Sequence, residues 1–400
     1  MGPFRTLYID MNSFFASVEQ QLDPRLRGRP VAITAMEGNH GACVAASYEA
    51  KAFGVKTGTS VRDARHLCPD IVFLPSRHRL YVRFNLRVAD VIDRHAELER
   101  IRSVDEFQVV LSGEATTLHG AAQLVARLKA AVAAEVGPCL RFSAGIGPNH
   151  LLAKIAGKLQ KPDGFRWLWP GNMPDAIAHL ALDDLPGISG AMRERLLRAG
   201  VRDVPALCAL DPRHARAIWH SIEGERFVRS LQGAPVPLVE TRRGGFGNSK
   251  VLAPDFRDPV AAYLVSRWLV EKAASRLRRE GRTAASFSLS VHPLDRPRWG
   301  GALRCAATQD TAEFLRINRR LWHSAWPAIR GSQLLAVGIH LGDVALLVER
   351  SGDLLAPLAP AERSQGERVS VAADFINARF GPGTIRFGIN RPHPGFFERG

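Results

Sequence analysis

The chain has 400 residues, 46% of them hydrophobic and 23% charged, and 54 Lys and Arg against 39 Asp and Glu give a formal net charge of +15. This composition excludes a fully disordered or fibrous protein, and the length predicts two to four domains. No run approaches the roughly 18 consecutive apolar residues of a membrane span, and the five cysteines are scattered without CxxC spacing, so we expect no membrane association, no disulfide framework, no zinc site and a cytoplasmic location.

Residues 1–170 alternate between short apolar runs and amphipathic segments. This alternation predicts an α/β or α+β core. These residues carry no glycine signature of the Rossmann or Walker type. The expected strands are 5–10, 30–34, 101–111 and 139–147, and the expected helices are 13–21, 47–54, 79–98, 119–137 and 149–160.

The rest of the chain predicts a helical segment, a linker, a second folded domain and a tail. Residues 171–240 are helical in pattern and contain the turn sequence LPGISG with a helix expected on either side, and residues 241–248 predict a glycine-rich linker. Residues 249–343 have the order strand, helix, two strands, helix and strand, which is typical of a βαββαβ domain with its helices on one face of an antiparallel sheet. Residues 344–400 predict an appended tail with one helix that ends at Gly381.

The positive charge is concentrated in two parts of the chain. Residues 1–170 carry 22 basic and 16 acidic side chains and residues 247–350 carry 16 and 9, so together they hold +13 of the net charge. Arginine outnumbers lysine 46 to 8, and guanidinium groups match the geometry of phosphate oxygens. Two basic regions favour a polyanion held between them, and nucleic acid is the leading candidate. A merely soluble basic surface is the alternative.

Three acidic residues lie within apolar segments. Asp10 ends an apolar strand, and Asp105 and Glu106 are adjacent in the second strand-like segment SVDEF. Neighbouring strand residues face opposite sides, so both carboxylates reach one point only at a strand end, a bulge or a tight turn. Converging carboxylates repel, and oxygen-only ligands favour magnesium or manganese, which in pairs serve phosphoryl transfer. The alternative is that Asp10 caps the following helix and the other two carboxylates pair with arginines.

Two further features could bind phosphate groups. Lys154, Lys158 and Lys161 recur on one face of a predicted helix, and Tyr48 and Lys51 add a hydroxyl and a cation on a separate element. The LPGISG turn at residues 185–190 would expose backbone amides, as helix-hairpin-helix elements do when they hold duplex DNA. The alternatives are a solvated lysine face and an ordinary helix connection.

Taken in order, these motifs resemble the Y-family DNA polymerases, the translesion enzymes, of the bacterial DNA polymerase IV and polymerase V catalytic-subunit type. The matching segments are YIDMNSFFASVE, LRGRPVAI, SYEAKAFGVKTG, CPDIVFLP, SVDEF, FSAGIGPNHLLAKIAGKLQKPDG and LPGIS, spread over nearly the whole chain. The resemblance implies an α+β fold in the form of a right-hand polymerase. Its parts would be a ferredoxin-like palm at 1–25 and 75–170, small fingers at 26–74, a helical thumb with a helix-hairpin-helix turn at 171–240, and a βαββαβ little finger at 249–343.

The resemblance also implies a role for each matching residue. Asp10, Asp105 and Glu106 would be the catalytic carboxylates and, with the main-chain carbonyl of Met11, would bind two Mg²⁺ ions, with Mn²⁺ as a substitute. Phe15 would lie under the sugar of the incoming dNTP and exclude a 2′-hydroxyl. The other implied contacts are Phe14, Tyr48, Lys51 and Lys161 with the nucleotide, Gly41, Ala42 and Val44 with the nascent base pair, Ser103 and Lys154 near the reacting ends, and Lys154, Gly187, Ser189, Gly190, Arg242, Arg243 and Lys250 with primer–template DNA.

Several positions depart from the family pattern. Ala45 replaces a usual threonine and Lys51 a common arginine, which predicts fewer contacts with the triphosphate. Phe107 and Gln108 stand where Ala-Tyr is usual, and His150 replaces a common lysine. No departure removes a carboxylate.

The resemblance implies a low-fidelity, template-directed DNA polymerase that extends primers past damage. A sliding clamp is a further possible partner, although GDLLAPL at 352–358 lacks the glutamine and the terminal aromatic of a clamp-binding peptide. The alternatives are a non-catalytic DNA-binding accessory protein of the same fold, which would typically lose the carboxylates, and a palm-type nucleotide cyclase, which would need neither the LPGISG turn nor the basic second domain.

Overall fold

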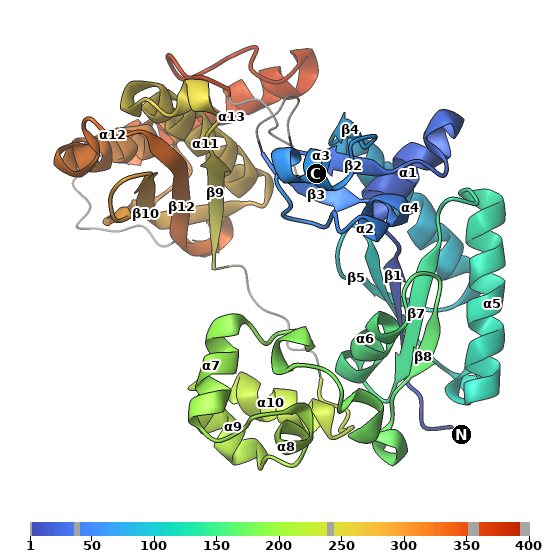
Figure 1. Ribbon diagram of the computed structural model, residues 1–400. Coiled ribbons are helices and arrows are strands. Elements are labelled where there is room, and N and C mark those ends of the chain that lie inside the picture. The colour runs from blue at the N-terminus through green and yellow to red at the C-terminus, as the bar shows by residue number, and fades with distance from the viewer. Residues whose placement is uncertain (1, 36–40, 238–243, 351–359, 393–400) are drawn as a thin grey trace. The chain divides into compact units, whose positions relative to one another are not determined.

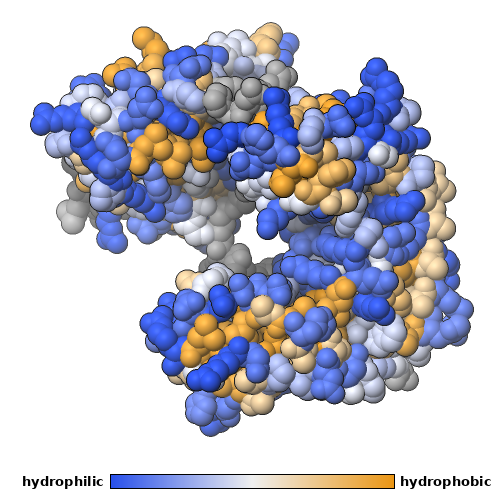
Figure 2. Space-filling model, in the orientation of Figure 1, coloured by the Kyte–Doolittle hydropathy of each residue, from blue (hydrophilic) through white to orange (hydrophobic). Residues whose placement is uncertain are grey.

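The structure, a computed structural model, describes residues 2–35, 41–237, 244–350 and 360–392 (Figure 1). These residues form two compact units, 2–237 and 244–392, and each is described by itself. Hydrophilic residues cover most of the surface seen in Figure 2, with apolar residues in smaller groups. Within the described ranges, no helix is both long enough and apolar enough to cross a membrane.

A five-stranded sheet forms the centre of the first unit. Its strands have the order β5-β6-β1-β7-β8, and β1 is antiparallel to both β6 and β7. Helices α4 and α5 pack on the face that carries Leu7, Ile9 and Met11, and α6 lies against the opposite face (Figure 1). The elements are β1 Thr6–Met11, β5 Leu98–Ile101, β6 Glu106–Val110, β7 Phe142–Gly147, β8 Phe165–Trp167, α4 His78–His95, α5 Leu118–Glu135 and α6 His150–Leu159.

Two glycines allow α6 to lie directly on β7. A Cβ atom at Gly145 would come within 2.1 Å of the Gly157 nitrogen and 2.2 Å of the Ala153 carbonyl oxygen. Only a residue without a side chain permits this approach. The close packing holds the lysine-bearing helix next to the central strand that ends at Asp10.

A small three-stranded sheet and the helices around it make up residues 14–75. The sheet has the order β3-β2-β4, with β2 antiparallel to β3 and parallel to β4. Helix α2 begins after Ser47, whose hydroxyl accepts a hydrogen bond from the Ala50 amide at 3.3 Å. The elements are α1 Phe14–Leu22, β2 Val31–Thr34, β3 Cys43–Ala46, α2 Tyr48–Ala52, α3 Val61–Leu67 and β4 Val72–Pro75.

The first unit ends in a group of short helices. They share a core with the apolar face of α6, in which Leu152 and Ile155 meet Leu196 and Val228. The helix expected before the LPGISG turn was a wrong prediction, because only a single 3₁₀ turn, Leu182–Asp184, forms there. The helices are α7 Gly190–Arg198, α8 Val204–Cys208, α9 Pro212–Trp219 and α10 Ile222–Leu231.

The second unit has the predicted βαββαβ order. Its antiparallel sheet has the order β11-β10-β12-β9, and helices α11 and α12 cover one face. The elements are β9 Gly245–Val251, α11 Pro259–Arg279, β10 Arg282–Pro293, β11 Trp299–Thr308, α12 Thr311–Ile329 and β12 Leu334–Leu346. The predicted linker 241–248 overlaps the first strand, because β12 pairs with β9 from Gly245 onward.

The residues expected to form an appended tail are built into the second unit instead. Helix α13, Pro360–Phe380, packs against α11 and α12. The Arg278 guanidinium, 5% exposed, forms a salt bridge of 2.7 Å with Asp374, and Arg350 forms one of 2.7 Å with Glu367. A buried arginine needs such a partner, so this part of the chain completes the domain.

Candidate active site

The three predicted carboxylates lie together at one end of the central sheet. Asp10 on β1 and Glu106 on β6 are direct cross-strand partners, so their side chains leave the same face of the sheet. Asp105 is the last residue of the turn between β5 and β6, and its carbonyl accepts a hydrogen bond of 2.9 Å from the Met11 amide. Because Asp105 lies in the turn and not in the strand, its side chain need not point away from that of Glu106, the first residue of β6.

Each carboxylate has a hydrogen-bonding or ionic partner. The Lys161 ammonium lies 2.5 Å from Asp10, and the Lys154 ammonium lies 2.7 Å from Glu106. The Ser103 hydroxyl donates a hydrogen bond of 2.5 Å to Asp105. The alternative pairing of Asp105 and Glu106 with arginines is absent from the contacts of the described residues, and Ser13, not Asp10, occupies the N-cap position of α1.

Burial and mutual repulsion set the charge state of this group. Burial raises the pKa of Asp105, and the charges of Asp10 and Glu106 raise it further, although the hydrogen bond from Ser103 opposes the shift. Burial alone would raise the pKa of Glu106, but the hydrogen bond and the charge of Lys154 outweigh it and hold this pKa below its ordinary value. The site therefore concentrates negative charge that needs compensation by cations.

The donor atoms of this group match a hard divalent cation. They are carboxylate oxygens from three residues at one sheet end, with no histidine or cysteine among them, and such a set suits Mg²⁺ or Mn²⁺. As the side chains stand, no three His, Cys, Asp or Glu residues of the described ranges are arranged around one ion. Two of the three carboxylates pair with lysine ammonium groups instead, so a bound cation would compete with Lys154 and Lys161 for Glu106 and Asp10.

Phe14 and Phe15 have different surroundings at the start of α1. Phe14 is buried in the core, at 3% exposure, and the structure therefore does not bring it to the surface where a nucleotide could touch it. Phe15 is half-buried and stacks on Tyr81, with ring centroids 4.1 Å apart. The Tyr81 hydroxyl donates a hydrogen bond of 2.7 Å to the buried Glu19, which fixes the platform under Phe15.

The predicted phosphate-binding residues of α2 lie beside the start of α1. The Lys51 ammonium donates a hydrogen bond of 2.8 Å to Ser13 and lies 4.4 Å from the centroid of the Tyr48 ring. Burial and the charge of Lys161 lower the pKa of Lys51, although the charge of Asp10 opposes the shift. Two cations that repel each other at a half-buried position favour an anionic ligand.

The residues expected near the base pair lie on and before β3. Val44 is 38% exposed, and Ala42 forms an isolated bridge with Ser60. Gly41 has φ +118°, a backbone conformation that side-chain-bearing residues rarely adopt. Small or absent side chains leave this segment of the surface open.

Two family models match most of the chain. The model described as the impB/mucB/samB family matches residues 9–158, and the model of its C-terminal domain matches residues 243–354. The chain belongs to this family, the Y-family translesion DNA polymerases. It is 34% identical to a DNA polymerase IV of Moorella thermoacetica over 96% of the chain and 95% of the relative, and 32% identical to one of Pelotomaculum thermopropionicum over 98% and 97%.

Solved structures show the same fold. A Y-family DNA polymerase chimera of Dbh and Dpo4 has a TM-score of 0.72 at 19% identity, covering 86% of this chain and 99% of that one. At this identity the similarity concerns the fold alone. It confirms the α+β polymerase architecture that the motifs predicted.

In this Y-family chain, the LPGISG turn has the backbone of a tight connection. Gly187 has φ +94°, and the Ser189 hydroxyl accepts a hydrogen bond from the Met192 amide at 3.3 Å as the N-cap of α7. A Cβ atom at Gly190 would meet no atom within 4 Å. The turn is therefore open on the side where a phosphate could approach.

The DNA-binding residues predicted around residue 245 have mixed outcomes. Arg242 and Arg243, like the clamp-peptide candidate 352–358, lie outside the described residues. Lys250 alternates with Ser249 along β9, so it shares the helix-covered face with Phe246, and burial lowers its pKa. This placement does not support a contact between Lys250 and DNA.

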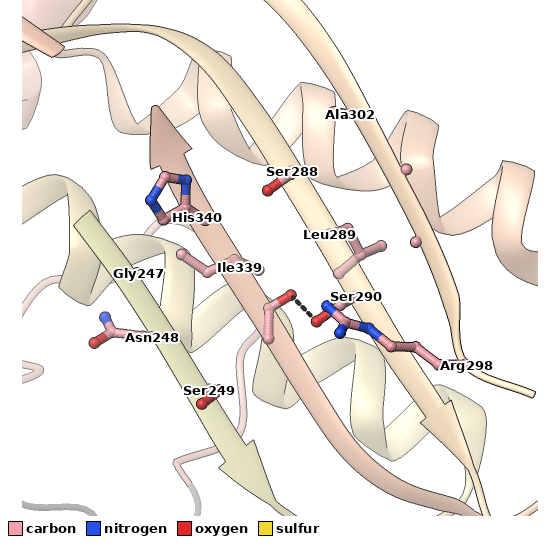
Figure 3. A pocket seen from close by; sticks show the side chains of 13 residues that line it. Gly247, Asn248, Ser249, Ser288, Leu289, Ser290, Arg298, Ala302, Ile339 and His340 are labelled. Atoms are coloured by element: carbon pink, nitrogen blue, oxygen red, sulfur yellow. Dashed lines mark hydrogen bonds between the residues drawn. The ribbon is translucent and has the colours of Figure 1, made fainter. Parts of the chain in front are cut away.

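The open face of the second sheet carries small residues that the motif search missed (Figure 3). Two cross-strand rows run over it, Ala302-Ser288-His340-Gly247 and Gly300-Ser290-Gly338-Ser249. These residues, together with the exposed Arg298, line a shallow pocket of about 520 Å³. The alternation of serine with Phe287 and Leu289 in the sequence SFSLS was the available signal, because it marks one polar and one buried face.

Proposed function

We propose that this chain is a template-directed DNA polymerase that adds deoxynucleotides to a primer 3′ end and copies past damaged bases with low fidelity. The observation that carries the proposal is the register pair Asp10 and Glu106, flanked by Asp105, by Lys154 of α6 and by Lys161 just after this helix. Family membership and the relatives named DNA polymerase IV support the same reaction. By the same relation, the five-stranded sheet serves as palm, residues 26–74 as fingers, the short helices as thumb and the second unit as little finger.

Asp10, Asp105 and Glu106 would hold two divalent ions, Mg²⁺ in the cell or Mn²⁺ as a substitute, with the Met11 carbonyl as a further ligand. Bound ions lower the pKa of an attacking 3′-hydroxyl and neutralise charge on the phosphates. Lys161 and Lys154, released from their carboxylates, then face anionic substrate groups instead. The pairs thus keep the lysines in place before the substrates arrive.

The remaining residues of the first unit would bind and select the nucleotide. Lys51 and Lys161 would bind the triphosphate, whose negative charge compensates the repulsion between them, and Tyr48, beside Lys51, would supply a hydroxyl. Phe15, backed by Tyr81, excludes a 2′-hydroxyl by filling its position. The small residues Gly41, Ala42 and Val44 leave room for distorted base pairs, and a loose pocket cannot make a wrong pair clash.

Primer–template DNA would contact the LPGISG turn and the open face of the second sheet. Glycine and serine rows allow a sugar-phosphate backbone to approach the strands closely, and Arg298 adds a cation at their edge. A sliding clamp could recruit the chain through residues 352–358. The free, scattered cysteines of the described chain suit a reducing cytoplasm.

Primer extension on a DNA template tests the proposal. Asp105→Ala and Glu106→Ala should each lower the rate by roughly 10²- to 10⁴-fold, because a held cation stabilises the transition state by several kcal/mol. Asp90→Asn, which removes an exposed carboxylate on α4, is the matched control and should retain the full rate. Full activity in both alanine variants refutes the assignment, and DNA binding without extension by the wild-type chain would indicate an accessory protein.

A further inference from the structure

Tyr8 lies behind the catalytic carboxylates, two residues before Asp10 on the same face of β1. It is 1% exposed and pairs in register with Gln108 and Gly145. Its hydroxyl oxygen accepts a hydrogen bond of 2.9 Å from the Lys154 ammonium, which lies 2.7 Å from Glu106. Lys154 is therefore shared between the phenol oxygen of Tyr8 and the Glu106 carboxylate.

The ring of Tyr8 is held independently of its hydroxyl. The Lys154 ammonium lies 5.0 Å from the ring centroid, and the His150 ring packs at 6.1 Å on the same aromatic system. Burial, followed by the charges of Arg102 and Lys154, lowers the pKa of His150 to about 4, so this neighbour is neutral at neutral pH. A phenylalanine would keep these ring contacts and lose only the hydroxyl.

This sharing of Lys154 matters when Glu106 binds a cation. Lys154 then loses its carboxylate, and a half-buried ammonium without an acceptor is costly. The phenol oxygen of Tyr8 remains as an acceptor, so Lys154 can leave Glu106 without being stranded. Without the hydroxyl, Glu106 would be the only hydrogen-bond acceptor of Lys154 among the residues that the structure describes, and the ammonium would compete with the cation for it.

We infer that Tyr8 is a positioning residue for the metal site: its hydroxyl retains Lys154 when Glu106 turns to a divalent cation. This inference rests on the proposed function, because it assumes that Glu106 is a metal ligand. Partners in the outer shell of a metal site commonly change affinity by 10- to 100-fold. Tyr8 acts through Lys154 and Glu106 and need not touch the substrates.

The test measures equilibrium binding of Mn²⁺ to the full-length protein with no DNA or nucleotide present. The electron paramagnetic resonance signal of the free ion reports how much Mn²⁺ remains unbound. Tyr8→Phe should weaken the binding that depends on Glu106 by about tenfold. Tyr263→Phe, which removes a phenol hydroxyl in the second unit, is the control and should leave Mn²⁺ affinity unchanged. Thermal unfolding of both variants shows whether a change in affinity accompanies a loss of fold.

A double-mutant cycle separates positioning from a purely structural role. Lys154→Met removes the competing ammonium, so adding Tyr8→Phe to it should change Mn²⁺ affinity by less than twofold. An unchanged affinity in Tyr8→Phe alone, or an equal loss in both backgrounds, overturns the inference. If the wild-type chain shows no Mn²⁺ binding that Asp105→Ala or Glu106→Ala removes, the metal assignment of the proposed function is refuted instead.

Discussion

The contact between α6 and β7 gives a graded prediction, because it sets the position of two lysines against the carboxylates. In Gly145→Ala the new Cβ atom would lie 2.1 Å from the Gly157 nitrogen, whereas ordinary contacts begin near 3.4 Å. The Gly157 nitrogen and the Ala153 carbonyl oxygen that the new Cβ atom would meet belong to the backbone of α6, so the helix itself must move away by about 1 Å. Overpacking of this kind costs about 1–3 kcal/mol of stability, and a misplacement of about 1 Å lowers catalytic rates by roughly 10²-fold.

Two other glycines complete the series. A Cβ atom at Gly157 would lie 3.3 Å from the Gly145 nitrogen, so Gly157→Ala requires a shift of only a few tenths of an ångström, and alanine favours the helix by about 1 kcal/mol. A Cβ atom at Gly244 would meet nothing within 4 Å, which makes Gly244→Ala the control. Single-nucleotide primer extension and thermal unfolding should rank Gly145→Ala well below Gly157→Ala, with the control at the wild-type level. A wild-type rate in Gly145→Ala, or a larger loss in Gly157→Ala, would refute the reasoning.

Three further outcomes are expected. Phe15→Ala should raise ribonucleotide insertion relative to deoxynucleotide insertion by about 10- to 200-fold, the range for a misfit of 1–3 kcal/mol, as measured by single-turnover incorporation of each nucleotide. Burial raises the pKa of Asp105 in the folded chain, so ionisation of this carboxyl destabilises the fold as pH rises through that pKa. Asp105→Asn should therefore raise the melting temperature of the EDTA-treated protein at pH 7, and the difference in melting temperature from the wild type should vanish in acid. Arg298→Ala should reduce the slope of log DNA affinity against log salt by up to about 0.9, and an unchanged slope would remove Arg298 from the DNA contacts.

Local patterns predicted the elements that carry the site, and they failed where partners decide the structure. The apolar run of residues 5–10 predicted the strand that carries Asp10, and β1 forms there with Leu7 and Ile9 in the core. Segment 101–111 was expected as one strand, but only its second half forms β6, after a turn that delivers Asp105. The short strands β3, β4 and β8 were not predicted, because three or four residues give little periodicity, although the apolar run of residues 30–34 sufficed for the equally short β2.

The partners of the catalytic groups could not be predicted either. Lys154 and Lys161 were expected near the substrates, but their pairing with Glu106 and Asp10 depends on how closely α6 approaches β7, which is set by packing at Gly145 and Gly157 and not by the local pattern. Tyr8 looked like an ordinary core residue. Only the registered neighbours of β1 reveal that its hydroxyl meets Lys154.

Net charge by segment identified the second unit as basic, but the structure shows that part of this charge serves the fold. Arg278 is bound to Asp374, Arg276 to Asn248, and Arg267 to the main-chain carbonyls of residues 387 and 389. The pocket on the open face of the sheet, by contrast, is lined largely by glycine and serine, and Arg298 is the one arginine among its lining residues. Arginines that already hold backbone and carboxylate groups release few counterions when DNA binds. The salt dependence of DNA binding should therefore be weaker than the segment charge of +7 suggests. Close approach of the DNA backbone to small residues, more than charge density, would define where this face binds DNA.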